Sequence, residues 1–215
     1  MISRPMHPLQ VERMPTSDAD AAGTPAQARA VLEFWFGHPD SPEHGAARPQ
    51  WFTKDPQFDA AIRERFGGLV ERARAGELDA WEREPESALA LILVCDQFPR
   101  NLYRGDPRAF ELDSRALALV QRFVERGWDR NLSPVQRTFV YLPFEHSESI
   151  ADQRRAVSLF ESIRDDSFGA QGYDYALRHL RVIERFGRFP HRNDALGRES
   201  TPEEIAFLRE PGSSF

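Results

Sequence analysis

The same helix-start pattern, a capping residue followed by proline, occurs five times in this chain and constrains its fold more than any other feature. A residue with a capping side-chain oxygen directly precedes proline at Thr24-Pro25, Asp55-Pro56, Asp106-Pro107, Ser133-Pro134 and Thr201-Pro202. The oxygen accepts hydrogen bonds from amides that lack a partner in the first helical turn, and proline has no amide there to leave unsatisfied. Glu204 extends the last start to a capping box. These starts predict a helical architecture.

Apolar-periodic segments follow these starts, and glycines mark where they are expected to end. Those glycines are Gly37, Gly76, Gly127 and Gly187. The predicted helices span residues 25–36, 56–75, 86–98, 107–126, 134–142, 149–164, 172–187 and 202–209. No segment alternates apolar and polar residues as a strand does, so we expect no strands. Short connections predict antiparallel neighbours in an all-α fold.

The chain is expected to form a single helical domain over residues 24–215, preceded by an extension. Residues 1–23 are rich in Pro, Ala, Ser and Asp and show no periodicity, which predicts a mobile segment. They contain no apolar run of the kind that signal peptides need. The longest apolar run, residues 88–95, is too short to cross a bilayer. We therefore expect a cytoplasmic protein that does not bind membranes.

Charge and cysteine content exclude further classes of protein. The net charge is −6 and no basic block is present, which argues against a general affinity for nucleic acid. A single cysteine, Cys95, excludes an internal disulfide and fits a reducing compartment. The sequence contains neither Glu-x-x-His nor His-Glu-x-x-His, and Cys95 has no Cys-x-x-Cys partner. We predict no metal site and no cofactor.

The first polar stretch follows a run of apolar residues, 88–95, that predicts a helix buried on all sides. Asp96 comes next, and Pro99 is expected to end the helix shortly after it. A carboxylate in the last helical turn faces the negative end of the helix dipole, so Asp96 should pair with a cation. Arg100 or Arg104 can supply that cation, and Asn101 lies between them. Alternatively, the pair only locks the helix end to its loop.

The second polar stretch surrounds His146. Ser149 and Asp152 have the spacing of a capping box, so a helix should start there, with His146 and Glu148 in the turn before it. Ligands approach readily at such turns. Both His146 and Gln153 are expected to point inward, and Glu148 can orient an imidazole for acid–base work. The alternative is that His146 is a hydrogen-bonded core residue.

The third polar stretch, RFPHRN, echoes the earlier QFPRN, since in both an apolar helix is followed by Phe-Pro, arginine and asparagine. It follows a helix whose inward stripe includes His179. In one interpretation its arginines and Asn193 cap terminal carbonyls and His191 is solvated. In the other, Arg188 and Arg192 join the arginine of the first motif in a cleft for an anion, with His191 as acid or base.

Several of these strings together resemble a known family. VLEFWFG, DQFPRNLYRG, YLPFEHSE followed by Gln153, and RFGRFPHRN with LGRESTPEE are similar to the mainly bacterial family called domain of unknown function 924. The likeness runs from about Ala28 to the C-terminus. The resemblance implies an all-α fold similar to tetratricopeptide-like superhelices. It implies no known activity, and it assigns no catalytic residues.

The leading functional hypothesis is a site for a small anionic ligand, with or without acid–base catalysis. Polar side chains lie at the ends and inner faces of the most apolar helices, where burial without partners costs several kcal/mol. The candidate catalytic residues are His146, Glu148 and His191. The candidate binding residues are Asp96, Arg100, Asn101, Arg104, Gln153, His179, Arg188, Arg192 and Asn193.

The alternative hypothesis is a helical scaffold that binds a peptide or a partner protein on a concave face. It predicts an exposed apolar patch, and it predicts that internal salt bridges consume the polar motifs. A homodimer also fits, because the apolar residues 31–36 are either core or a dimer surface. Trp51 and Phe52 precede a helix cap. We expect them to belong to the core or, alternatively, to form a lid or rim of the site.

Overall fold

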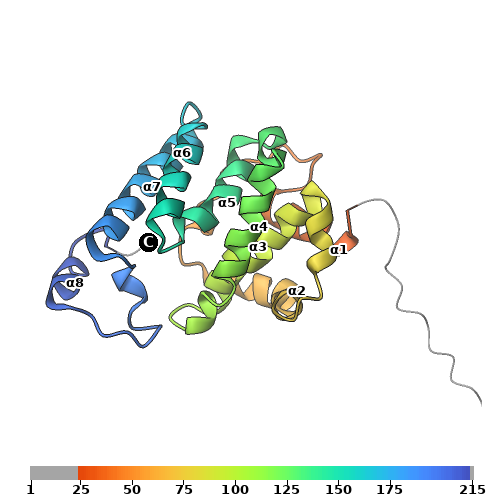
Figure 1. Cartoon of the computed structure of the whole chain (residues 1–215). Helices are drawn as coiled ribbons and strands as arrows, with labels where there is room; N and C mark the ends of the chain where they lie inside the picture. Colours follow the sequence, from red (N-terminus) through yellow and green to blue (C-terminus); the bar gives the residue numbers. More distant parts are fainter. Residues whose placement is uncertain (1–23, 214–215) are drawn as a thin grey trace, which may run out of the picture.

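Every regular element in residues 24–213, which the computed structural model describes, is helical (Figure 1). In this range the α-helices are α1 (Ala26–Phe36), α2 (Pro56–Arg74), α3 (Pro85–Leu102), α4 (Asp113–Glu125), α5 (Pro134–Glu145), α6 (Ile150–Glu161), α7 (Ser167–Phe186) and α8 (Pro202–Phe207). Short 3-10 helices connect them: η1 (Pro49–Trp51), η2 (Asp79–Arg83), η3 (Pro107–Ala109), η4 (Trp128–Asn131) and η5 (Pro190–Arg192). The predicted all-α fold is confirmed. The expected N-terminal extension, residues 1–23, lies outside the described residues.

Side-chain caps begin several of these helices as the sequence predicts. The cap predicted at Thr24 is wrong, because α1 starts after Pro25 without a side-chain cap and the Thr24 hydroxyl donates to Glu86. The Asp55, Ser133 and Thr201 side chains each accept a backbone N–H from the first turn of α2, α5 and α8. Asp106 also caps, but it starts only η3, and α4 begins separately at Asp113. The single helix predicted over residues 107–126 is therefore wrong at its start.

Two prolines lie inside helices at positions where a helix end was predicted. Helix α3 continues through Pro99 to Leu102, and α5 continues through Pro143 to Glu145. Each proline removes one backbone hydrogen bond from its helix. Both are buried in the surrounding core, and the packing of these helices offsets that loss. Asp96 consequently lies in the body of α3, two turns from where the helix ends.

The turn between α5 and α6 differs in detail from the expected capping box. Helix α6 begins after Ser149 as predicted, but the Ser149 side chain makes no capping hydrogen bond. Instead, the Ser147 hydroxyl donates to Asp152 (2.8 Å) and accepts from the Ser149 amide (3.2 Å). The Ser147 hydroxyl therefore ties the turn to the Asp152 side chain in the first turn of α6, but it accepts no amide of the helix itself.

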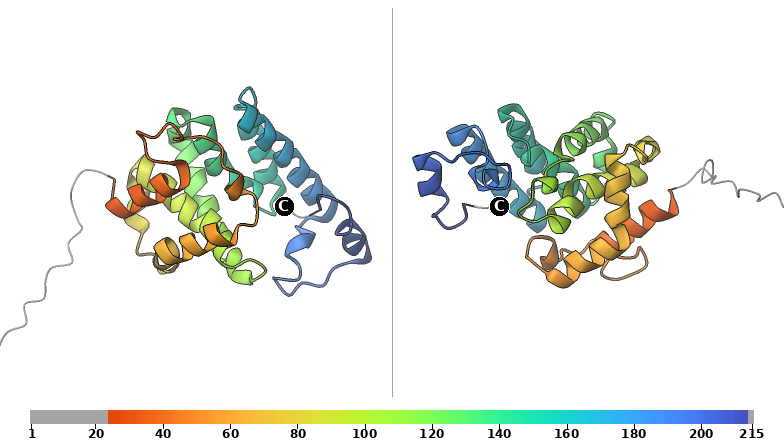
Figure 2. Two further views of the ribbon diagram at one scale, coloured as in Figure 1. Left: turned by 180° about the vertical axis from the view of Figure 1, so that it is seen from behind. Right: turned by 90° about the horizontal axis from the view of Figure 1, so that it is seen from below.

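Helix α3 forms the centre of the fold and packs against α1, α2, α4 and α5. Helix α5 also contacts α6 and α7, which pack against each other. Figures 1 and 2 show α6, α7 and α8 gathered at one side of the molecule, away from α1 and α2. Val31, Trp35 and Phe36 are buried in the main hydrophobic cluster, so the apolar end of α1 is core.

Close packing joins α7 to α6, and it depends on glycine. Asp166 caps α7 by accepting from two amides, so the helix begins at Ser167, five residues before the predicted start. This places Gly169 in the first turn, where an added Cβ would lie 2.0 Å from the Ile163 carbonyl oxygen. In contrast, a Cβ on Gly68 in α2 would meet no atom within 4 Å.

Two alanine substitutions should therefore change stability in opposite directions. Gly169→Ala is expected to lower the free energy of unfolding by about 1–3 kcal/mol, because the α6–α7 connection must shift. Gly68→Ala is expected to raise it by about 0.5–1 kcal/mol, because alanine favours a helix interior. Urea unfolding followed by circular dichroism measures both. Changes of the same sign would contradict this description of the two glycines.

Candidate functional site

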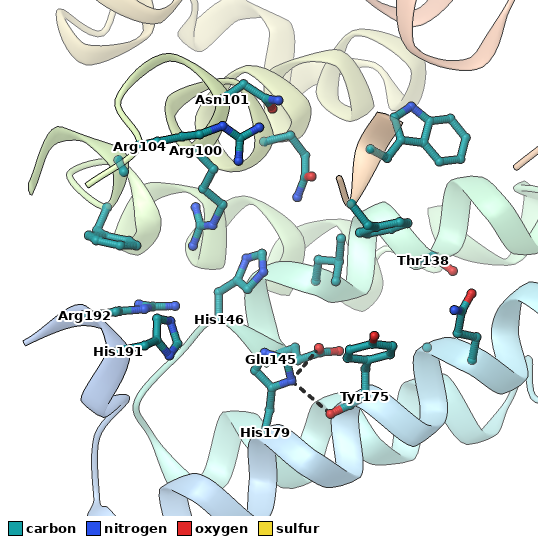
Figure 3. Close-up of a pocket in the computed structure, with 18 of the residues that line it drawn as sticks. Arg100, Asn101, Arg104, Thr138, Glu145, His146, Tyr175, His179, His191 and Arg192 are labelled. Atoms are coloured by element: carbon teal, nitrogen blue, oxygen red, sulfur yellow. Dashed lines mark hydrogen bonds and ion pairs between the residues drawn. The ribbon is translucent and has the colours of Figure 1, made fainter. Parts of the chain in front are cut away.

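A cavity of about 520 Å³ lies between α3, α5 and α7 and is bordered by η1, η3 and η5 (Figure 3). Its size suits a small molecule. The polar side chains on its wall are Gln97, Arg100, Asn101, Arg104, Thr138, Glu145, His146, Gln171, Tyr175, His179, His191 and Arg192. The large apolar side chains are Trp51, Phe52, Phe110, Leu142 and Phe168.

The three polar stretches of the sequence meet at this cavity. The predicted site residues on its wall are Arg100, Asn101, Arg104, His146, His179, His191 and Arg192. The remaining predicted residues lie outside the wall: Asp96, Glu148, Gln153, Arg188 and Asn193. The structure thus divides the predicted set into side chains that face the cavity and side chains that support it.

Asp96 joins the first stretch to the second. The carboxylate is fully buried, and its Oδ1 atom lies 2.7 Å from His146 Nδ1 and 3.3 Å from Arg100 Nη1. Burial alone would raise the pKa of Asp96, but its contacts with His146 and Arg100 hold the pKa at about 2. The expected cationic partner of Asp96 is therefore confirmed as Arg100.

His146, the C-cap residue of α5, is positioned as a neutral imidazole. Burial and the neighbouring Arg100 guanidinium lower the pKa of His146, although Asp96 opposes this shift. An ionised carboxylate only accepts hydrogen bonds, so His146 Nδ1 carries the proton and donates to Asp96. The lone pair then resides on Nε2, the other nitrogen of a ring that lines the cavity.

Asp113, the first residue of α4, joins the first stretch to the third. Arg100 donates two hydrogen bonds to its carboxylate, at 2.8 and 3.0 Å, and Arg192 Nη1 lies 3.2 Å from Oδ2. The echoed motifs therefore converge on one carboxylate, although Pro99 lies within a helix and Pro190 begins η5.

Arg192 is held on several sides. It is 7% exposed, and its guanidinium stacks on the rings of Phe110 and Phe189, with centroids 4.7 and 4.6 Å away. Burial and the charge of Arg100 lower the pKa of Arg192 to about 10, so the side chain remains cationic at neutral pH. Within residues 24–213, its buried Nε atom has no hydrogen-bond partner.

A second carboxylate–imidazole pair lies on the same wall. Glu145 Oε1 is 2.8 Å from His179 Nδ1, which also lies 2.9 Å from the Tyr175 carbonyl oxygen (Figure 3). Glu145 is 2% exposed, and its Oε2 atom has no hydrogen-bond partner among the described residues. The predicted inward orientation of His179 is confirmed, since the residue is buried and lines the cavity.

Asn101 and Arg104 reach the wall from the last turn of α3 and the residues after it. Both bind Asp59 in α2: the Asn101 amide at 2.8 Å, and Arg104 through Nε and Nη2 at 2.8 and 2.9 Å. Burial opposes ionisation of Asp59, but these contacts lower its pKa. Arg104 is consequently not the partner of Asp96.

Glu148 does not orient an imidazole, contrary to expectation. Its carboxylate forms a two-pronged pair with Arg198, at 2.8 and 3.0 Å, and accepts from the Phe189 amide at 2.8 Å. These bonds fasten the segment after α7 to the turn between α5 and α6. The imidazole of His146 is oriented by Asp96 instead.

The other predicted residues outside the wall also have supporting roles. The buried Gln153 donates to the carbonyl oxygens of Glu145 and Ser147, both at 2.6 Å, and so caps the end of α5. Arg188 binds both oxygens of Glu204, at 2.6 and 2.8 Å. Asn193 donates to the same carboxylate at 3.3 Å, which fixes the loop onto α8.

His191 lines the cavity beside Arg192 and is strongly shielded from protonation. Burial and the charge of Arg192 lower the pKa of His191 to about 3. The interpretation in which His191 is solvated is therefore wrong, because η5 folds inward against the cavity.

Glu145 lines the cavity and Asp113 binds two of its arginines, yet neither is among the residues predicted from the sequence. Glu145 ends a buried run of α5, so the argument that gave Asp96 a partner would also have found it. Asp113 carried no such signal, because an acidic residue in the first turn of an amphipathic helix is typical of a solvated helix start. Gln97 also lines the cavity outside the predicted set, and it donates a hydrogen bond to its neighbour Asp96.

Two further observations concern metals and membranes. Among the described residues, no three His, Cys, Asp or Glu side chains are grouped so that they could hold a metal ion. No helix within residues 24–213 combines the length and apolarity needed to cross a membrane.

Comparisons with other proteins agree with the fold. The model of a family described as bacterial protein of unknown function, DUF924, matches residues 31–212. A solved structure, protein of unknown function ATU0120 from Agrobacterium tumefaciens, is similar with a TM-score of 0.76 and 40% identity, covering 86% of this chain and 97% of that one. No curated protein matches. The chain therefore belongs to the DUF924 family of bacterial proteins of unknown function.

Proposed function

We propose that the cavity binds a small organic anion and that His146 acts on it as an acid–base group. The observation that carries this proposal is the pairing of Arg100 and Arg192 on one cavity wall. They come from distant segments, both are oriented by Asp113, and Arg192 Nε is buried without a partner in the described residues. An anion in the cavity supplies the acceptor that Nε lacks.

The balance of charge on the wall supports an anionic ligand. Arg100, Arg104 and Arg192 line the cavity, whereas Glu145 is the acidic residue among the lining side chains. The carboxylates that bind these arginines lie outside the wall and hold the guanidinium groups in fixed orientations. Donors arranged in advance lose little entropy when a ligand binds.

The Asp96–His146 pair supports acid–base chemistry. A carboxylate that accepts from one imidazole nitrogen fixes the tautomer, which leaves the other nitrogen as a base. The lowered pKa of His146 keeps this nitrogen unprotonated at neutral pH. Neighbouring arginines can stabilise negative charge that develops when a proton is removed from the ligand. Proton abstraction or hydrolysis fits this arrangement.

The alternative, a scaffold for a peptide or partner protein, fits a different set of residues. It expects internal pairs to consume the polar motifs, as they do for Glu148, Arg188 and Asn193. It does not account for the buried, unsatisfied atoms of Arg192 and Glu145, two residues that line the cavity. We therefore favour the small-molecule site.

A thermal-shift screen of carboxylates, phosphate esters and sulfonates tests the proposal. At least one of these anions is expected to raise the Tm of the wild-type protein. Arg192→Ala should weaken the binding of that anion roughly tenfold to a hundredfold, because this is the usual contribution of a charge-assisted hydrogen bond to affinity. Arg185→Ala is the matched control, because Arg185 is exposed on α7 and binds Glu203 away from the cavity.

Two results would overturn the proposal. One is that no anion in the screen stabilises the wild-type protein. The other is that every stabilising anion binds Arg192→Ala and the Arg185→Ala control equally well, which would place the ligand elsewhere.

A further inference from the structure

Glu145 is the acidic residue among those that line the cavity, and its ion-pair partner is a histidine rather than an arginine. Asp96 and Asp113, which lie behind the wall, each bind Arg100, whereas the ion pair that Glu145 forms is with His179. Its Oε2 atom is buried, and no described residue donates to it. A carboxylate oxygen in this state is stabilised by a donor, and a cationic N–H donor gives the largest gain.

Exposed aromatic rings mark the part of the cavity where an apolar group can bind. Phe52 and Tyr175 line the cavity although they are 58% and 42% exposed. Phe52 packs against Trp51 and Phe168, with ring centroids 6.5 and 6.1 Å apart, and both of these residues also line the cavity. Covering such rings with an apolar ligand group removes their surface from water.

The polar groups follow an order along the cavity. In Figure 3, Arg100 and Arg192 lie toward one side, Thr138 and Tyr175 lie toward the other, and Glu145 lies between them. The aromatic cluster adjoins the Thr138 side, because Trp51 packs on Phe139 with ring centroids 4.9 Å apart. A ligand that meets all three regions carries an anionic group, a donor and an apolar body in that order.

From this arrangement we infer that the ligand is an α-amino acid with an apolar or aromatic side chain, or a molecule that carries the same three groups. The inference rests on the proposed function, since the carboxylate takes the place of the organic anion beside Arg100 and Arg192. The ammonium group donates to Glu145 Oε2. The side chain covers Phe52 and Tyr175.

Calorimetric titration of the full-length protein with three matched probes tests the inference. Phenylalanine carries all three groups, 3-phenylpropanoate lacks the ammonium group, and phenethylamine lacks the carboxylate. Phenylalanine is expected to bind at least roughly tenfold more tightly than either of the others, because each comparison removes one charged hydrogen bond.

Variants then test whether Glu145 binds the ammonium group of phenylalanine. Glu145→Gln keeps the size of the side chain and should weaken phenylalanine roughly tenfold or more, with 3-phenylpropanoate changed by less than about threefold. Glu161→Gln is the control, because Glu161 is exposed on α6, away from the cavity. Phe52→Ala removes a ring that is 58% exposed, and it should weaken phenylalanine roughly threefold to tenfold.

The outcomes separate this inference from the proposed function. If 3-phenylpropanoate binds as tightly as phenylalanine, or if Glu145→Gln leaves their ratio unchanged, the amino-acid inference is wrong and the anion site stands. The same holds if another anion stabilises the protein while phenylalanine does not bind. If neither the probes nor any anion of the thermal-shift screen binds, both are wrong.

Discussion

Asp96→Asn is expected to lower the free energy of unfolding by about 3–5 kcal/mol at pH 7, the cost of breaking a buried ion pair from one side. The carboxylate is 0% exposed, and it accepts from His146 and Gln97 while lying 3.3 Å from Arg100. Asparagine keeps the shape but not the charge, and its amide nitrogen presents donors where the neighbours also donate.

Urea unfolding measures this loss, and Asp129→Asn is the matched control. Asp129 is also buried, but its Oδ2 atom accepts from the neutral Tyr141 hydroxyl at 2.8 Å, so we expect a cost of only about 1–2 kcal/mol. The pKa of Asp96 is about 2 in the folded protein and 3.8 ordinarily, so its stabilising effect is lost as the pH falls from 4 to 2. Equal losses in the two variants at pH 7 would contradict this account of Asp96.

Acid is expected to begin destabilising the wild-type protein as the pH falls below 6.5, because of His191. The unfolded chain binds a proton at this residue near pH 6.5, whereas the folded protein binds it only near pH 3. Stability is therefore present above pH 6.5 and is lost as the pH falls toward 3. After allowance for partial exposure, the loss amounts to about 2–4 kcal/mol. The groups whose charge acts on His191 are Arg192, His179 and His146, which disfavour its protonation, and Glu148, which favours it.

The comparison of two histidine variants isolates this effect. His191→Gln should flatten the fall in unfolding free energy between pH 6.5 and 4, because glutamine does not titrate. His38→Gln is the matched control, since the His38 side chain is 59% exposed. Denaturant titrations at several pH values measure both variants. An unaltered slope in His191→Gln would show that other groups cause the acid sensitivity.

Most of the fold could be predicted because helix starts are local. The capping side chains of Asp55, Ser133 and Thr201 act within their own first turns, so the sequence alone identifies them. The helix ends at Pro99 and Pro143 could not be predicted in the same way. A proline costs one hydrogen bond locally, and whether a helix continues through it depends on tertiary packing.

The candidate site could be predicted only in part, for a similar reason. His146 and Arg192 were found because polar side chains beside buried runs require partners. The identity of those partners depends on which helices meet. Asp113 appears in the sequence as an ordinary helix start, yet α3 and η5 both direct an arginine toward it. Glu148 was predicted to support an imidazole because it is near His146 in sequence, but its side chain turns toward Arg198.

The most direct test of the anion site is a crystal structure of the protein grown with the anion that most raises its Tm. We predict that an oxygen of its anionic group lies at hydrogen-bonding distance, about 2.7–3.2 Å, from Arg192 Nε, the buried donor without a partner among the described residues. Arg100 and Arg192 should remain on Asp113 in that complex. An anion bound outside the cavity, or a cavity without the anion at saturating concentration, would contradict the proposed function.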